Sequence, residues 1–178
     1  MPAIAGTNIL TATPLMKKLL EIARQYAGTD YPVFIYGETG TGKELVARHI
    51  HELSRYHDHP FVVESPGAVP DSILESELFG HTAGAFSGAS SDRPGLLQSA
   101  TGGTLFLDGV DEASPRFQAV LLRFLQSGVV RPLGGSRTLQ IPVRLICSSR
   151  LRDADLKTRL REDFFFRIST LQMEIPSL

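Results

Sequence analysis

A glycine-rich loop between an apolar run and a helical pattern constrains the fold of this chain more than any other feature. The run VFIY (33–36) has the β-branched and aromatic content of a buried strand, and a helical pattern follows over 42–53. Between them, GETGTGK (37–43) fits the pattern G-x-x-x-x-G-K. A strand, this loop and a helix in that order predict a phosphate-binding P-loop rather than a plain glycine-rich helix cap.

The residues of the loop explain how it would hold a polyphosphate. Glycine adopts positive φ without steric cost, so Gly37, Gly40 and Gly42 are expected to turn backbone amides inward, beside a helix N-terminus that favours anions. Lys43 would reach the β- and γ-phosphates. The next residue, usually a Ser or Thr that binds magnesium, is Glu44, so the metal would depend more on other ligands. The predicted nucleotide-binding residues are Gly37, Glu38, Thr39, Gly40, Thr41, Gly42, Lys43 and Glu44.

The rest of the chain alternates apolar runs with helical patterns. Strands that alternate with helices predict a mostly parallel sheet with helices on both faces, a three-layer α/β/α fold. A chain of 178 residues suits one such domain. Beside the strand at 33–36, the predicted elements are strands at 61–64, 104–107 and 143–147, helices at 14–27, 42–53, 71–78 and 115–125, and a hairpin between GVVR and TLQI. Asp71 is the predicted N-cap of the helix that begins there.

An acidic residue follows the apolar run TLFL (104–107) at the expected tip of its strand. In P-loop proteins a carboxylate at this place holds magnesium directly or through water. Asp108 is therefore the predicted Mg²⁺ ligand, and the alternative is an Asp that only closes the strand into a turn.

Charge and hydropathy argue against several other classes. Eighteen Lys and Arg against 19 Asp and Glu give a net charge of −1, which provides no overall basic field for nucleic acid. No apolar run approaches the roughly 20 residues that cross a bilayer, and the N-terminus has no basic leader, so a soluble cytoplasmic protein is expected. Cys147 lies in an apolar run and is expected to be a buried hydrophobic residue.

Two histidine pairs, 49/51 and 57/59, invite comparison with metal sites. Residues two apart on a helix point to different faces, so the first pair would not chelate a metal. The second pair lies in a polar stretch, and all four are expected to be surface histidines.

Several segments together resemble the central AAA+ domain of bacterial enhancer-binding proteins, the ATPases that remodel sigma-54 RNA polymerase. The resemblance is collinear over about residues 5–178, and it implies an AAA+ P-loop fold, ATP and Mg²⁺ as cofactors, and assembly into a hexameric ring. In that family an acid follows the lysine, so Glu44 conforms to the pattern. The segments are GETGTGKELVARHIH, LESELFGHTAGAFSGA, GGTLFLD, LLRFLQSG and LREDFFFRI.

The Gly- and Ser-rich segment 79–95 shows neither helical nor strand periodicity, which alone indicates a linker or a functional loop. The resemblance implies that its sequence GAFSGA matches the family's GAFTGA loop, which contacts sigma-54. Ser87 stands where Thr is usual, and Phe86 would be the apolar probe. The predicted partner-binding residues are Gly84, Ala85, Phe86, Ser87, Gly88 and Ala89.

Arg161 and Arg167 have catalytic roles only through the resemblance. Taken alone, two arginines at this spacing are typical of a solvated helix. The resemblance implies that they are arginine fingers, which reach the γ-phosphate bound to a neighbouring subunit, a role that suits a planar bidentate guanidinium.

Three positions depart from the family pattern around the γ-phosphate. The Glu that polarises the attacking water is replaced by Gly109, and two family asparagines align with Ser65 and Arg150. General-base assistance is typically worth about 10²- to 10⁴-fold, so hydrolysis is expected to be weak unless Asp111 or Glu112 replaces the missing acid. The residues thus predict that nucleotide binding is intact and that activation of the attacking water is impaired.

Three functions remain open from the sequence. The first is an activator ATPase that acts on sigma-54 RNA polymerase, and the second is a hydrolysis-impaired module that works as a switch. The third, which depends on the P-loop alone, is a small-molecule kinase. The family continues into a helical lid and often a DNA-binding domain, so residues 1–178 are expected to be the α/β subdomain only, as a fragment or a reduced relative, with DNA contact through a domain absent from this chain.

Overall fold

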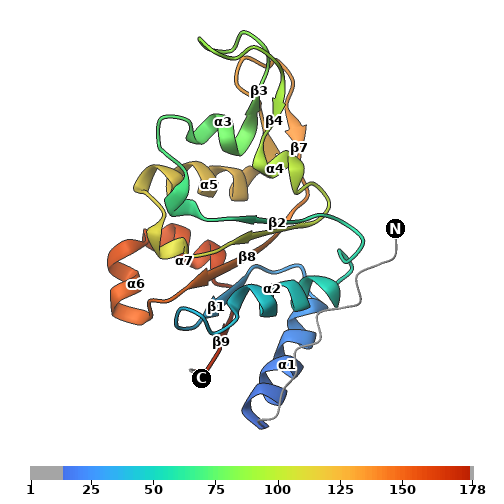
Figure 1. Cartoon of the computed structure of the whole chain (residues 1–178), viewed down its shortest axis with the longest axis vertical. Coiled ribbons are helices and arrows are strands. Elements are labelled where there is room, and N and C mark those ends of the chain that lie inside the picture. Colours follow the sequence, from blue (N-terminus) through green and yellow to red (C-terminus); the bar gives the residue numbers. More distant parts are fainter. Residues whose placement is uncertain (1–13, 177–178) are drawn as a thin grey trace.

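The computed structural model describes residues 14–176, with the backbone alone at 153 and 154 (Figure 1). The N-terminal stretch inspected for a leader therefore lies outside the described residues. A five-stranded parallel sheet forms the centre of the domain, in the order β2-β5-β8-β1-β9. Its strands are β1 (Val33–Tyr36), β2 (Phe61–Glu64), β5 (Thr104–Leu107), β8 (Arg144–Ser149) and β9 (Leu171–Glu174).

Helices cover both faces of this sheet, as predicted. On one face, α1 and α2 bury apolar side chains against Val33 and Ile35, whereas Phe34 points to the opposite face and packs with the other core cluster, which includes α5 and α7. The alternation along β1 thus divides the core into two layers. The helices are α1 (Pro14–Ala27), α2 (Lys43–Glu52), α3 (Leu74–Phe79), α4 (Leu96–Ser99), α5 (Pro115–Ser127), α6 (Asp153–Arg159) and α7 (Glu162–Ile168).

Most predicted elements are confirmed, and each difference has a physical cause. Asp71 was expected to cap α3, but that helix begins after Ile73, and the Asp71 carboxylate accepts a hydrogen bond from Ser114 Oγ at 2.5 Å instead. Ser114 also caps α5 by accepting from Phe117 N. The edge strand β9 was not predicted, because its LQME sequence is only partly buried and has no continuous apolar run. Cys147 is fully buried, as expected.

Two small hairpins project together from the sheet (Figure 1, top). One pairs β3 (Gly80–His81) with β4 (Arg93–Pro94), and the other pairs β6 (Val129–Val130) with β7 (Leu139–Gln140), as predicted. Leu133 N donates to Gly80 O at 2.9 Å, so the two hairpins are joined by backbone hydrogen bonding. Among the described helices, none has the length and apolar content needed to span a bilayer.

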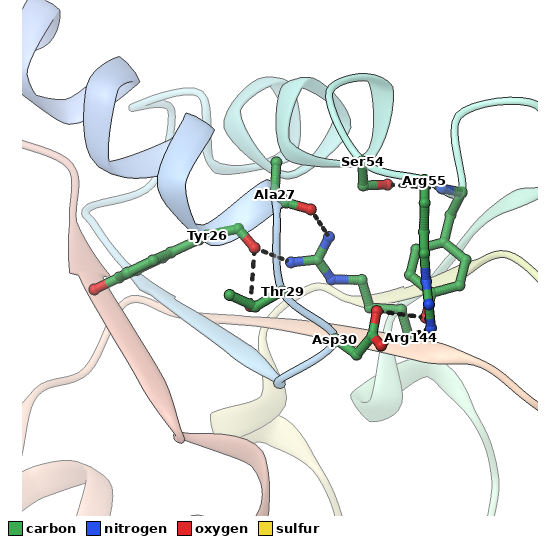
Figure 2. A network of polar contacts seen from close by, with 8 residues as sticks. Tyr26, Ala27, Thr29, Asp30, Ser54, Arg55 and Arg144 are labelled. Atoms are coloured by element: carbon green, nitrogen blue, oxygen red, sulfur yellow. Dashed lines mark hydrogen bonds and ion pairs between the residues drawn. The ribbon is translucent and has the colours of Figure 1, made fainter.

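A buried arginine at the start of β8 ties α1 to the sheet (Figure 2). The Arg144 guanidinium donates to Tyr26 O at 2.6 Å and to Ala27 O at 3.4 Å. Both carbonyls belong to the last turn of α1, where carbonyl groups lack partners within the helix and a positive charge is favourable. Burial lowers the pKa of Arg144, so the cost of burying the guanidinium offsets part of this gain.

Replacing Arg144 with methionine is expected to lower the free energy of unfolding by about 1–3 kcal/mol, because Ala27 O and Tyr26 O would lose the guanidinium, although Thr29 would still donate to Tyr26 O. Denaturant unfolding measures this change. The control is Arg55→Met, which removes an exposed arginine paired with Asp30 at 2.6 Å and should lower the free energy of unfolding less than Arg144→Met, because solvent screens this pair. Equal losses in the two variants would contradict the capping role.

His51 is not a surface histidine, contrary to the prediction. It is only 4% exposed, its Nδ1 lies 2.9 Å from Thr104 Oγ1, and its ring packs on Phe61. The inward face of α2 brings it against the sheet. His49 is partly buried, and His57 and His59 are exposed, as expected for the second pair. Among residues 14–176, no cluster of His, Cys, Asp and Glu has the arrangement of a metal site.

Burial lowers the pKa of His51 below 6.5, so the folded protein resists a proton that the unfolded chain accepts. The resulting stability is present above pH 6.5 and is lost as the pH falls below it. We expect the free energy of unfolding to decrease on acidification from about pH 7.5 to 5.5. His51→Gln should show a smaller decrease in the free energy of unfolding. Part of the decrease should remain, because burial also lowers the pKa of His49. An unchanged decrease would contradict this assignment.

Candidate functional site

The P-loop connects β1 to α2, and its glycines serve two different purposes. Gly40 and Gly42 have φ of 84° and 86°, as predicted, and Gly42 precedes the first residue of α2. The same prediction is wrong for Gly37, which is not in the left-handed region. At Gly37 a Cβ atom would lie 2.7 Å from Thr41 Oγ1, so glycine is needed there for close approach.

The Lys43 side chain lies along the inside of this loop. Its Nζ donates to Gly37 O and to Glu38 O, each at 2.9 Å, and Thr41 Oγ1 donates to Glu38 O at 2.8 Å. Among the described residues no carboxylate lies within ion-pair distance of Lys43. An ammonium that is held only by neutral carbonyls keeps its charge available for a phosphate.

Glu44, the acid that follows Lys43, is directed to its own helix. Its Oε1 pairs with Arg48 NH2 at 2.9 Å, one turn further along α2. The same guanidinium lies 4.5 Å from the centre of the Phe61 ring. Arg48 therefore compensates the charge of Glu44 close to the phosphate-binding loop.

Asp108 follows β5 and faces the P-loop across one cleft. Its backbone N–H donates to Glu64 O at 2.9 Å, and its Oδ1 accepts a 2.5 Å hydrogen bond from Ser148 Oγ. Ser148, fully buried at the end of β8, also accepts from Gly109 N at 3.1 Å. Sequence reasoning missed this positioning role, for which the polar SS pair after an apolar strand was the available signal.

The cleft has a volume of about 410 Å³ and brings five of the eight predicted phosphate-binding residues together with Asp108, the predicted metal ligand, while Gly37, Glu38 and Thr41 do not line it. It also contains the three positions that depart from the family pattern around the γ-phosphate, together with both acids considered as replacements. Its lining consists of Thr39, Gly40, Gly42, Lys43, Glu44, Ser65, Asp108, Gly109, Asp111, Glu112 and Arg150.

The chain after Gly109 forms the short 3₁₀ helix η2 (Val110–Glu112). Gly109 itself has φ of 73° and ψ of 50°, and a Cβ atom there would meet no atom within 4 Å. Asp111 and Glu112, the two acids of η2, both pair with Arg150 rather than lying free in the cleft.

The two predicted arginine fingers do not line this cleft. Arg161 donates to both carboxylate oxygens of Asp163, at 3.1 and 2.8 Å, and Arg167 donates to Leu125 O at 2.5 Å. Hydrogen bonding within the first pair raises the pKa of Arg161 and lowers that of Asp163. Both arginines are exposed, and each is held within its own chain.

A buried amide connects the first of these arginines to the cleft. Gln118 is 1% exposed, and its Nε2 donates to Ala113 O and Arg159 O, each at 3.0 Å. Its Oε1 accepts from Arg161 N at 2.8 Å. A single side chain of α5 therefore joins the residue after η2 to the segment that carries Arg161.

The GAFSGA sequence lies between β3 and β4 as a turn with internal hydrogen bonds, and not as a linker. Gly84 N donates to Ala89 O at 2.8 Å, and Ala89 N donates to Phe86 O at 3.0 Å. The Phe86 side chain remains 43% exposed, with its ring against that of His81 at a centroid distance of 4.9 Å. His81 Nδ1 lies 2.8 Å from Ser76 Oγ, which connects this loop to α3.

A parallel sheet in this order, with a P-loop after β1 and an acid after β5, defines a P-loop NTPase of the AAA+ class. The P-loop NTPase domain of a sigma-54 transport activator from E. coli shows the same fold, with a TM-score of 0.62 and 20% identity over 95% of this chain and 99% of that one. A family model described as the sigma-54 interaction domain matches residues 9–174. The chain belongs to the sigma-54 interaction domain family.

Relatives within this family are longer proteins. The transcriptional regulatory protein GlrR of Escherichia coli (strain K12) is 46% identical over 96% of this chain and 39% of its own length. The Nif-specific regulatory protein of Azorhizobium caulinodans is 47% identical over 98% of this chain and 29% of its own length. The chain therefore spans about a third of these relatives. NtrX from Brucella abortus in complex with ATP has a TM-score of 0.83 and 30% identity over 96% of this chain and 37% of that one.

Proposed function

We propose that residues 1–178 form the ATP-binding α/β part of a sigma-54-dependent transcriptional activator. The observation that carries this proposal is the meeting of Lys43 and Asp108 in one cleft next to the P-loop. Family membership and the ATP complex of NtrX support it. The small-molecule kinase has no observation of its own in its favour.

The residues around the cleft fit a nucleotide with magnesium. Backbone amides of residues 37–44 would surround the phosphates, and Lys43 would bind the β and γ groups. Mg²⁺ is usually held by one or two carboxylates together with substrate phosphates, so the fixed carboxylate of Asp108 fits that donor set. The bound ion would neutralise phosphate charge during transfer.

The positions of Arg161 and Arg167 support a ring. Both lie outside the cleft of their own chain, so they would meet a γ-phosphate only across a subunit boundary. We propose a homo-oligomer, hexameric as in the family, in which each subunit completes the site of its neighbour. Its action on polymerase would take place in the cytoplasm, with DNA bound through another domain.

The exposed Phe86 loop is the proposed contact with sigma-54. Phe86→Ala is expected to weaken binding of purified sigma-54 to the ATP-bound protein by about tenfold or more, because a solvent-exposed aromatic anchor is lost. Affinity for ATP should stay unchanged. Leu15→Ala, which removes an exposed apolar side chain from α1, is the control and should bind sigma-54 normally. Equal binding by both variants would argue against this surface.

The proposal also includes weak hydrolysis of the bound ATP. Gly109 provides no group to orient water, and the two nearby acids are paired with Arg150. Lys43, four further residues of the P-loop and Asp108 nonetheless line the cleft. A ligand that prefers one state shifts the population towards it, so ATP binding would act as a switch with little turnover.

A further inference from the structure

A second cavity lies where the C-terminal half of α5 meets the β6–β7 hairpin, and it is called the hairpin cavity below. Its volume is about 810 Å³. Pockets that hold small organic ligands typically have about 300–1,000 Å³. The lining comes from residues 120–127 of α5, from 129–135 and 138 of the hairpin, and from Glu75 and Phe79 of α3. None of these residues lines the cleft around Lys43, so the two sites are separate.

One part of the hairpin cavity is apolar. Val120, Phe124 and Val130 line it and are buried members of the core cluster that includes α5 and α7. Phe79, which is partly buried, packs against the same cluster. Side chains held in a packed core keep their positions, so this wall is preformed for the apolar body of a ligand.

The charged residues of the hairpin cavity leave an excess of positive charge. The guanidinium of Arg123 has no acid within ion-pair distance among the described residues. Arg131 Nε donates to Gly135 O at 2.8 Å, which fixes this guanidinium on the turn while its two amino groups stay available. Glu75, the one acid among the described residues of the lining, already pairs with Arg116 at 3.1 Å. The cavity therefore favours an anion.

The C-terminal end of α5 also lies at this cavity, and the carbonyl end of a helix repels anions. Two of its last carbonyl groups already have donors. Ser127 Oγ donates to Arg123 O at 3.0 Å, and the charged Arg167 donates to Leu125 O at 2.5 Å. These contacts compensate part of the negative helix end, so the two arginines of the lining decide the charge preference.

The hairpin cavity borders the turn that supports the GAFSGA loop. Leu133 and Gly134 line the cavity, and Leu133 O accepts from Thr82 N at 3.0 Å. A Cβ atom at Gly134 would lie 2.8 Å from Ala85 Cβ, so this turn and the start of the GAFSGA sequence are in close contact. A ligand that holds the turn would therefore also hold the base of the loop.

We propose that the hairpin cavity binds a small organic anion with an aromatic or aliphatic body. Arg123 and Arg131 bind its anionic group, because a guanidinium offers paired planar donors to oxyanions, and the apolar wall takes the body. The bound ligand steadies the GAFSGA loop through the turn at 131–135. The site itself goes beyond the proposed function, and only the meaning of the loop for sigma-54 rests on that function.

Fluorescence titration of the 178-residue chain with anilinonaphthalene sulfonate, which has an aromatic body and one negative charge, tests the site. Arg123→Met should weaken sulfonate binding about tenfold, because a charge-assisted contact is lost. Binding of phenylnaphthylamine, a neutral probe of similar shape, should change less than about twofold, since it makes no such contact. The matched control is Arg159→Met. Arg159 is an exposed arginine of α6 outside the cavity, so both affinities should stay the same.

Two further variants locate the bound probe. Glu75→Gln removes the acid of the lining, so the sulfonate should bind about threefold more tightly. Gln126→Trp fills the cavity from an exposed position and should weaken both probes. Equal sulfonate affinity in Arg123→Met and Arg159→Met, equal losses of both probes in Arg123→Met, or unchanged binding in Gln126→Trp overturns the site. Thermal unfolding of each variant shows whether it is folded. Mg-ATP should not displace the sulfonate, so failure of nucleotide binding is a separate result.

Hydrogen exchange tests the effect on the loop. At a sulfonate concentration ten times its Kd, exchange of the Thr82 amide should slow about tenfold, because opening of the turn requires an empty cavity. The amide of Leu53, which donates to His49 O at 3.1 Å at the end of α2, is the control and should exchange as before. Unchanged exchange at Thr82 with the probe bound overturns the coupling between the cavity and the loop.

Discussion

Replacing Lys43 with alanine is expected to weaken the binding of ATP by about 100-fold or more and that of ADP by about tenfold or more. ATP would lose two charge-assisted contacts, to its β- and γ-phosphates, whereas ADP would lose only the β contact, and each contact is worth about 1.5–3 kcal/mol. In the free protein the Lys43 ammonium donates to the carbonyls of Gly37 and Glu38 and pairs with no carboxylate among the described residues, so its removal leaves no unpaired carboxylate behind. The substitution should therefore affect the ligand far more than the fold.

Calorimetry with Mg-ATP and Mg-ADP measures the effect, and denaturant unfolding confirms that the variant is folded. Lys17→Ala is the control, since Lys17 is an exposed lysine of α1 that does not line the cleft. A Lys43→Ala protein with the affinity of the unaltered chain would remove the main support for nucleotide binding at this loop.

Introducing glutamate at position 109 is expected to raise ATP turnover by about 100-fold, at the low end of what general-base assistance provides. The structure offers room, because a Cβ atom at Gly109 would meet nothing within 4 Å. The backbone there is left-handed, however, so any side chain would cost about 1–2 kcal/mol of stability. The gain in turnover should thus accompany a lower unfolding temperature.

Gly109→Ala separates these two effects, because alanine meets the same backbone strain and supplies no carboxylate. Steady-state phosphate release, measured at protein concentrations that favour assembly, should increase only in the glutamate variant. Rapid turnover by the unaltered protein, abolished by Lys43→Ala, would overturn the proposal of weak hydrolysis. In that case Asp111 or Glu112 becomes the candidate base.

The P-loop and most of the sheet are predictable because their signals are local. Residues 33–43 contain strand, loop and lysine in one stretch, and the apolar run of β5 ends directly before Asp108, which marks that residue as the acid at the strand tip. Contacts between distant segments carry no such signal. His51 contacts Thr104, 53 positions away in the chain, and Asp71 bonds to Ser114, 43 positions away. His51 was therefore wrongly predicted to be exposed, and Asp71 was wrongly predicted to cap α3.

The functional site likewise combines features that the sequence predicts with features that it does not. The sequence identifies the P-loop and Asp108, but it does not reveal that Ser148 holds the Asp108 carboxylate or that Arg150 pairs with both acids of η2. Those relationships depend on the adjacency of β5 and β8, which lie 37 or more positions apart in the chain. Only the sheet order brings them together.

The buried amide of Gln118 couples the turn after Asp108 to the segment that carries Arg161. Its carbonyl oxygen accepts from the backbone of Arg161, and its amino group donates to Ala113 O and to Arg159 O, so both ends of the amide are occupied. A displacement of the turn after Asp108 must therefore either move the arginine of one protomer or break a solvent-shielded bond. In the proposed ring, where Arg161 would reach the neighbouring site, Gln118 would couple the turn after Asp108 in one subunit to the nucleotide bound at the next.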